Sequence, residues 1–149
     1  MLSTKIPPPI VMLCFALGIV TSKNIFPEIK YDYLLYMGVA FELFGLVILM
    51  MSIIAFRKNK TTISPFRPYK ASSLVVDGVF AISRNPMYLA MASILFGLSL
   101  QFNVLGGLLF FVCFISYINV WQIKPEEKAL LSIFAAEYIT YKNTVRRWI

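Results

Sequence analysis

The chain has 149 residues, of which 59% are hydrophobic and only 14% charged, and its mean hydropathy is +0.76. Soluble domains carry roughly 45–50% apolar and about 25% charged residues, so this composition excludes an ordinary soluble domain and favours a membrane protein. The net charge of +7 comes from basic residues that flank apolar segments, which argues against nucleic-acid binding, and the lack of histidine excludes imidazole bases and histidine-ligated metals.

Four apolar segments, each a candidate membrane-spanning helix, follow one another along the chain. A spanning helix needs about 20 apolar residues, so the first segment is short, and a secretory signal peptide is the alternative interpretation of it. Only a tight reversal fits between the last two, which makes them an antiparallel hairpin. We therefore expect one all-α integral membrane domain, residues 1–149, with about four transmembrane helices at residues 7–21, 33–56, 86–102 and 104–123.

The basic residues predict the orientation of these spans. Of the 14 lysines and arginines, only Lys23 and Lys30 fall on one side, and the others share the side that holds both termini. The positive-inside rule makes that side cytoplasmic. It also carries a long loop, 61–88, and a tail, 124–149, and loops of such length usually have a function. We expect the loop and the tail to cap a cofactor pocket at the inner helix ends.

Within the loop, Asn85-Pro86 marks a helix start, because Asn is a favoured N-cap and Pro a favoured first helical residue. The free N–H groups of this helix start are suited to an anion such as an amino-acid carboxylate. The simpler interpretation is that the pair only begins the third span. Arg84 likewise has a simpler interpretation as an interfacial anchor.

The tail has the periodicity of a helix. Glu126 and Glu127 follow Pro125, in the first turn, as the helix dipole prefers. An amphipathic helix lying on the membrane surface explains the apolar stripe but explains the paired glutamates poorly. The stripe consists of Leu131, Phe134, Tyr138, Tyr141, Val145 and Trp148, which recur at spacings of three and four.

Glu42 lies well inside the second span, between Gly38 and Gly45 at helical spacing. A carboxylate within a membrane span is a functional-site hypothesis, here a base that takes a proton from the substrate. The structural alternative is a hydrogen bond across a close helix contact that the two glycines permit.

Several motifs together resemble the membrane methyltransferase family of isoprenylcysteine carboxyl methyltransferases and phospholipid N-methyltransferases. The similarity covers roughly residues 61–149. The motifs that carry it are Ser72 to Phe80, Ser83-Arg84-Asn85-Pro86-Met87-Tyr88-Leu89, Pro125-Glu126-Glu127, Leu130-Leu131, Phe134, Glu137-Tyr138, Tyr141 and Val145-Arg146-Arg147-Trp148.

The resemblance implies S-adenosylmethionine as the cofactor, enclosed by the loop and the tail. Arg84, Glu126 and Glu42 are the candidate catalytic residues, and Arg84, Arg146 and Arg147 would hold an acidic lipid head group. Gln122 falls where the prenylcysteine enzymes place a substrate-facing arginine. The implied cofactor-binding residues are Ser72, Ser73, Leu74, Val75, Phe80, Asn85, Pro86, Met87, Tyr88 and Glu126.

The sequence departs from the family pattern at three positions. Asn85 stands where many members have histidine, and Ala135 replaces a common glycine. Gln122 is neutral, so a carboxylate substrate would lose a charge-assisted hydrogen bond there.

The expected function is methyl transfer from S-adenosylmethionine to a lipophilic acceptor, isoprenylcysteine-like or phospholipid-like, at the cytoplasmic membrane face. Methyl transfer depends on alignment more than on a strong base, so a site without histidine suffices. Two alternatives are a small proton-coupled multidrug transporter that uses Glu42 and a membrane reductase of the steroid-reductase type. The long loop and tail count against the transporter. The sequence does not indicate the oligomeric state.

Overall fold

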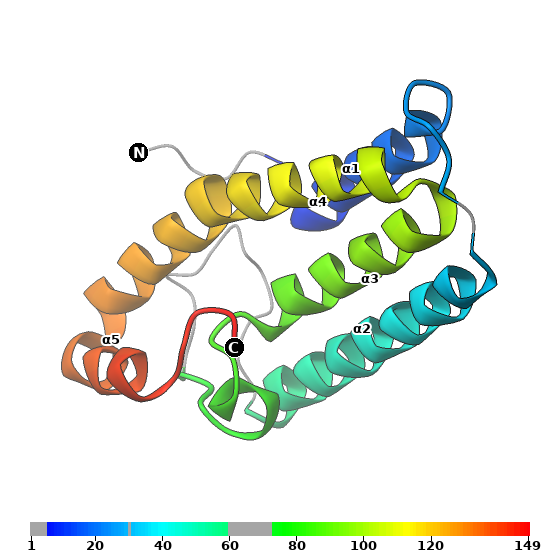
Figure 1. The fold of residues 1–149 in the computed structure, drawn as a ribbon. Helices are drawn as coiled ribbons and strands as arrows, with labels where there is room; N and C mark the ends of the chain where they lie inside the picture. Colours follow the sequence, from blue (N-terminus) through cyan, green and yellow to red (C-terminus); the bar gives the residue numbers. More distant parts are fainter. Residues whose placement is uncertain (1–5, 30, 60–72) are drawn as a thin grey trace.

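The computed structural model describes residues 6–29, 31–59 and 73–149, and within these residues every regular element is a helix (Figure 1). The predicted all-α class is therefore confirmed for the described residues. The predicted starts and ends of the apolar segments lie within two residues of the helix ends, except at residue 123, where the helix continues. Ser72 and the rest of 61–72 lie outside the described residues. The elements are α1 (Pro8–Ser22), α2 (Asp32–Lys58), the 3₁₀ helix η2 (Gly78–Ala81), α3 (Pro86–Phe102), α4 (Val104–Ile118), the π-helix η3 (Asn119–Ile123) and α5 (Lys124–Thr144).

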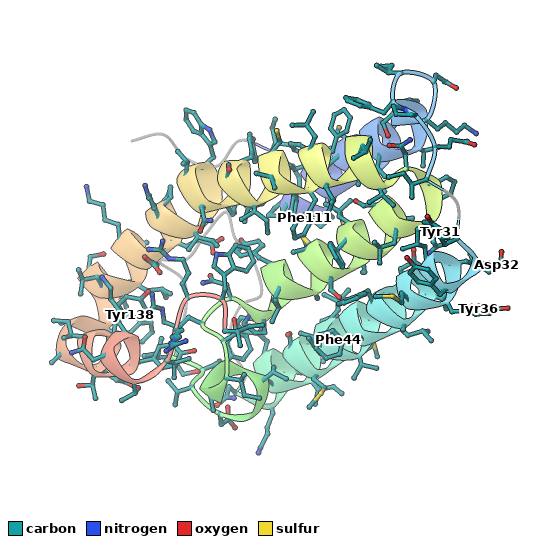
Figure 2. All side chains as sticks on the ribbon, viewed as in Figure 1. Tyr31, Asp32, Tyr36, Phe44, Phe111 and Tyr138 are labelled. Carbon is teal, nitrogen blue, oxygen red and sulfur yellow. The ribbon has the colours of Figure 1, made fainter. Side chains whose placement is uncertain are left out.

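Two described helices are long and apolar enough to cross a membrane, namely α2 and the continuous helix Val104–Thr144. α1 and α3 are shorter apolar helices, so their crossing of a membrane stays a prediction. The outer surface of α2 supports a lipid environment, because Tyr36 is 73% exposed, Leu43 58% and Phe44 53%. Figure 2 shows Tyr36 pointing away from the bundle.

Helix α3 occupies the centre of the bundle, with α2 on one side and α4 and α1 on the other (Figure 1). Small residues let α2 and α3 approach closely. A Cβ atom added to Gly97 would lie 2.5 Å from the carbonyl oxygen of Gly38, and one added to Gly45 would lie 2.7 Å from that of Ala90. Packing of this kind is typical of helices in membranes, where backbone contact replaces the hydrophobic effect as the driving force.

On the other side of α3, the main buried cluster joins α1, α3 and α4 through Ile19, Leu95 and Phe114, all fully buried. Asn103 alone connects α3 to α4. Its side-chain oxygen accepts a hydrogen bond from Gly106 N at 2.8 Å, which caps α4. The sharp reversal thus places the N-terminal end of α3 beside the C-terminal end of the α4–η3 helix.

The boundary between the fourth span and the tail is not a break, because α4, η3 and α5 form one continuous helix. The π-helix directly precedes Pro125, which has no N–H to donate to the preceding turn and whose ring crowds the carbonyl four residues earlier. In the π-helix the backbone hydrogen bonds span five residues instead of four, and this wider turn accommodates the proline. The helix then continues as α5, which carries charged residues and extends beyond the apolar part of the chain.

The expectation that the tail presents one regular helical face is wrong. Ala135 has φ 39° and kinks α5, and the helix ends at Thr144, so the spacing of three and four no longer keeps all six stripe residues on one face. Tyr138 and Tyr141 are buried, but Leu131 is 43% exposed. Val145 and Trp148 lie beyond the helix, in the segment that turns back toward α3.

Candidate functional site

The segment after α5, residues 145–149, runs back to the start of α3, and we call it the strap (Figure 1). Three successive strap carbonyls accept hydrogen bonds from residues of the loop. Val145 O accepts from Arg84 Nη1 at 2.8 Å, Arg146 O from the Arg84 backbone N–H at 3.0 Å and Arg147 O from Asn85 Nδ2 at 3.0 Å. The described part of the loop and the tail are therefore in direct contact, as predicted. That they enclose a cofactor stays a prediction.

One polar cluster, which we call the Glu126 cluster, joins α3, η3 and α5. Tyr88 Oη donates to Glu126 Oε1 at 2.6 Å, and Gln122 Nε2 donates to the same oxygen at 2.9 Å. Tyr88 and Gln122 are both buried, 7% and 3% exposed. The spacing of Gln122 and Glu126, four residues apart along the helix, places them on the same face.

A second cluster holds two arginines on one carboxylate. Arg84 Nη2 donates to Glu127 Oε1 at 2.9 Å, and Arg147 donates through Nε to Oε1 at 3.0 Å and through Nη2 to Oε2 at 2.8 Å. The side chains of Arg84 and Glu127 are 8% and 13% exposed, so this ion pair is largely removed from water. Arg84 Nη1 also donates to Lys142 O at 2.8 Å, and its buried Nε has no partner among the described residues.

Helix geometry separates the two clusters. Successive helical residues differ by about 100° in direction, so Glu126 and Glu127 point to different neighbours. Glu126 faces Tyr88 inside the molecule, and Glu127 faces the loop and the strap. Pro86 begins α3 as predicted, but Asn85 does not cap the helix with its side chain, because its amide is engaged by the strap.

The two glutamates have opposite electrostatic environments. Burial raises the pKa of Glu126 to about 7 and outweighs the hydrogen bonds from Tyr88 and Gln122, which lower it. Burial also acts on Glu127, but there the hydrogen bonds and charges of Arg147 and Arg84 prevail and hold its pKa below the usual value. The hydrogen bond to Glu127 raises the pKa of Arg147.

The predicted cofactor-binding residues that precede α3 lie at the C-terminal end of α2. Val75 and Phe80 are buried with Val79 against α2, and the Phe80 ring lies 5.1 Å from that of Phe56. Tyr141 Oη donates to Phe80 O at 2.7 Å, which ties this segment to α5. Leu74 and Met87 are partly buried, and Ser73 Oγ donates to Asn59 O at 3.1 Å.

Glu42 lies apart from both clusters. Its Oε1 accepts a hydrogen bond from Gln101 Nε2 at 2.7 Å, across the α2–α3 contact formed by Gly38 and Gly97. This contact matches the structural interpretation of Glu42, which was a hydrogen bond across a close helix contact permitted by glycines. A role of Glu42 in proton transfer stays a prediction.

The sequence predicts no role for Glu127 or Asn119, and in the strap it predicts only that Arg146 and Arg147 bind a lipid head group. Glu127 and Trp148 belong to motifs of the resemblance, but the sequence did not indicate which residues they contact. The Trp148 indole donates to Asn119 Oδ1 at 3.3 Å in η3. The available signal for the ion pairs was the presence of Arg84 in the loop and of Arg147 and the adjacent Glu126 and Glu127 in the tail.

The described structure is a helical protein whose apolar helices meet a buried polar site at one end of the bundle. The sequence profile of the phospholipid methyltransferase family matches residues 33–137, and the chain belongs to that family. An uncharacterized protein of Haemophilus influenzae is 41% identical over 63 residues, which are 42% of this chain and 100% of that protein. No solved structure matches the chain.

The family makes the protein a methyltransferase that acts on a lipid-like acceptor, and together with the two candidate spans it indicates a membrane location.

Proposed function

We propose that this protein transfers a methyl group from S-adenosylmethionine to a lipophilic acceptor at the cytoplasmic face of a membrane. The single observation that carries the proposal is the Glu126 cluster, in which a buried carboxylate joins the start of α3 to η3 and α5. The family match supplies the reaction class. When bound, S-adenosylmethionine supplies a methyl group on a positively charged sulfur.

The residues of the Glu126 cluster fit such a cofactor. Both hydrogen bonds that described residues make to the Glu126 carboxylate go to Oε1, so Oε2 is the atom that would accept from the cofactor's ammonium or hydroxyls. Tyr88 presents an aromatic ring, which attracts a sulfonium by cation–π interaction. The backbone N–H groups of Met87 and Tyr88, at the start of α3, suit the cofactor's carboxylate.

The charges around the cluster favour an amine over a carboxylate as the methyl acceptor. Gln122 is neutral, and Arg84 and Arg147 are both engaged by Glu127. A carboxylate acceptor would lie near the Glu126 carboxylate with Arg146 as the remaining exposed arginine of the tail. An amino phospholipid instead offers an amine. Its protonated form gains from a nearby anion, and after it releases a proton to water the nitrogen lone pair can displace the sulfide and take the methyl group. Holding the two reactants in line would supply most of the catalysis.

We further propose that both termini are cytoplasmic and that α1, α2, α3 and α4 with η3 all cross the membrane. The distribution of lysine and arginine supports this orientation. Neither α1 nor α3 reaches the length of a typical span, so each would cross with local thinning of the bilayer or with polar flanks near its surface.

A transfer assay tests the proposal. The purified protein is incubated in detergent micelles with S-adenosylmethionine carrying a radiolabelled methyl group and with fractionated lipids, and the lipid phase is counted. We expect label in the amino-phospholipid fraction and none with neutral lipids. Transfer to prenylated carboxylates instead would contradict the amine assignment, and failure to label any fraction would contradict the function.

A thermal-shift comparison separates this function from the reductase alternative. A ligand at 100 times its Kd stabilises the folded state by about 2.7 kcal/mol. We expect S-adenosylmethionine to stabilise the protein and NADPH to leave its unfolding temperature unchanged. The reverse pattern would favour the reductase. For the transporter alternative, Glu42 accepts a hydrogen bond from Gln101 between α2 and α3 within the described residues, which is a structural contact.

A further inference from the structure

We propose that the strap is a positioning device for the cofactor site. In this proposal Arg84 and Arg147, acting through Glu127, set the position of Glu126 relative to the start of α3 without touching cofactor or acceptor themselves. The inference rests on the proposed function, because it concerns the same cofactor site. It assigns Arg147 a different role from the binding of a lipid head group.

The ion-pair geometry fixes the first turn of α5. Glu127 receives three charge-assisted hydrogen bonds, and Arg147 contributes two of them in a bidentate arrangement. Bidentate arginine–carboxylate pairs fix direction as well as distance. Because the Glu127 side chain is largely buried, water competes weakly for these bonds. The rotation of this turn about the helix axis is therefore set by the two arginines.

The rotation of this turn also sets the direction of the Glu126 side chain. The carboxylate of Glu126 follows the backbone of the turn that Glu127 anchors, and it reaches Tyr88 Oη at 2.6 Å. A small rotation of the turn would lengthen this hydrogen bond and move the atom proposed to bind the cofactor's ammonium. Displacements of about 1 Å in such sites cost up to about 100-fold in rate, even when the change is made at a distance.

The strap also holds the start of α3, which lies across the site from α5. Arg84 precedes Asn85, and both bind strap carbonyls, so the start of α3 is held by the segment that Arg147 belongs to. Trp148 donates its indole N–H to Asn119 in η3 and packs against the buried cluster that contains Tyr88. The strap thus contacts α3, η3 and α5, the three elements that contribute to the Glu126 cluster.

A positioning role and a head-group role predict different kinetic changes. The side chain of Arg147 is 34% exposed, more than that of Arg84, so its replacement is the milder test of the ion pair. If Arg147 positions the cofactor site, its loss weakens cofactor binding and leaves the acceptor KM at saturating cofactor unchanged. If it binds the acceptor's head group, the acceptor KM rises and cofactor affinity stays the same.

The test compares full-length Arg147→Gln, Arg147→Lys and wild-type protein in micelles by calorimetric titration with S-adenosylmethionine. We expect the Kd of Arg147→Gln to rise about tenfold, and Arg147→Lys to recover part of the loss because it keeps the charge but not the bidentate geometry. Lys128→Ala, which removes an exposed positive charge from the same turn of α5, is the matched control and should bind as wild type does.

An unchanged Kd in Arg147→Gln, with or without a higher acceptor KM, would overturn the positioning role. A wild-type protein that does not bind S-adenosylmethionine would overturn the proposed function first, and the strap's role with it. These two failures are distinguishable because the first is read on the variant and the second on the wild type.

Tryptophan fluorescence tests the strap without disturbing the ion pair. The chain has two tryptophans, so Trp121→Phe leaves Trp148 as the only one, and Trp121 is 47% exposed on η3. We expect the emission of Trp148 to change when S-adenosylmethionine is added and to stay constant with ATP, which carries the same adenine. Constant emission at saturating S-adenosylmethionine would contradict contact between the strap and the cofactor site.

Discussion

Where α2 crosses α3, backbone meets backbone at Gly38 and Gly97, and the contact holds because nothing larger than hydrogen fits there. At the other end of α3, the large side chains of Arg84 and Glu127 fill the space between the segments, and they form an ion pair. The first region depends on the size of its residues and the second on their hydrogen-bonding partners. One half of the bundle is thus held by close backbone packing, while the other half carries the polar site.

The comparison predicts which substitutions each region tolerates. The bundle should accept apolar changes on its outer face and reject added volume at the α2–α3 contact. The polar end should accept changes of exposed charge and reject the loss of one partner from a buried pair. The predictions below test this difference, and they are read as free energies of unfolding in detergent micelles.

Loss of a partner from the buried ion pair should have the largest effect. Arg84→Ala removes hydrogen bonds to Glu127, Lys142 O and Val145 O, and we expect a loss of about 4 kcal/mol because three charge-assisted hydrogen bonds are lost and Glu127 keeps only Arg147 as its partner. Chemical denaturation measures it. Arg57→Ala, at an exposed position on α2, should change stability by less than about 0.5 kcal/mol. Equal effects of the two variants would remove the distinction between buried and exposed charge.

Added volume in the bundle should come next. Gly97→Val introduces a Cβ that would lie 2.5 Å from Gly38 O, so α2 and α3 must separate, and we expect a loss of about 3 kcal/mol. Leu43→Ala is the control. Leu43 is 58% exposed on the outer face of α2, so we expect its replacement to change the free energy of unfolding little. A stable Gly97→Val protein would show that this contact does not hold the bundle together.

The pH dependence of the unliganded protein should be smaller. The pKa of Glu126 is raised from about 4.5 to about 7, so its contribution to stability is complete below pH 4.5 and is lost as the pH rises through 7. At about 1.4 kcal/mol per pKa unit, we expect a loss of at most about 3 kcal/mol over this range, and Glu126→Gln should abolish it. Glu127 has the opposite effect on the pH profile. Its lowered pKa contributes stability above the ordinary carboxyl pKa of about 4.5, and that stability is lost as the pH falls below this value. A flat profile between pH 4.5 and 7 in the wild type would contradict the assigned environment of Glu126.

The smallest expected effect is a gain. Ala135 has φ 39°, a conformation that glycine adopts at less cost than alanine, so Ala135→Gly should stabilise the protein by about 1 kcal/mol. Ala136→Gly, one residue along the same helix, should instead destabilise it by about 1 kcal/mol because glycine weakens a helix interior. Thermal unfolding of the two variants shows whether each substitution stabilises or destabilises the protein. If both destabilise, the kink at residue 135 is not a position that favours glycine.

The bundle was more predictable from sequence than the site. Lengths of apolar runs and the Asn85-Pro86 pair located α3 at Pro86–Phe102, because these signals are local. The continuity of α4 with α5 was not predicted, since the π-helix compensates for Pro125 where a helix was expected to stop. Ala135 was noted as a departure from a common glycine, and its positive φ gives the physical meaning of that departure.

For the site, the resemblance selected Tyr88, Gln122 and Glu126, and the structure brings these three into one cluster. The sequence did not show that Arg84 and Arg147 share one carboxylate. That arrangement joins a loop to a tail far along the chain, and such contacts leave no periodic pattern. Nor did any local signal show that the tail turns back after Thr144.

Calorimetric titration of wild-type and Glu126→Gln protein with S-adenosylmethionine tests the central claim most directly. Glutamine keeps the size of the side chain and its capacity to accept from Tyr88 Oη, but it removes the charge that would bind the cofactor's ammonium. We expect saturable binding by the wild type and an affinity lower by about tenfold or more in the variant. Equal affinities of the two proteins would contradict it.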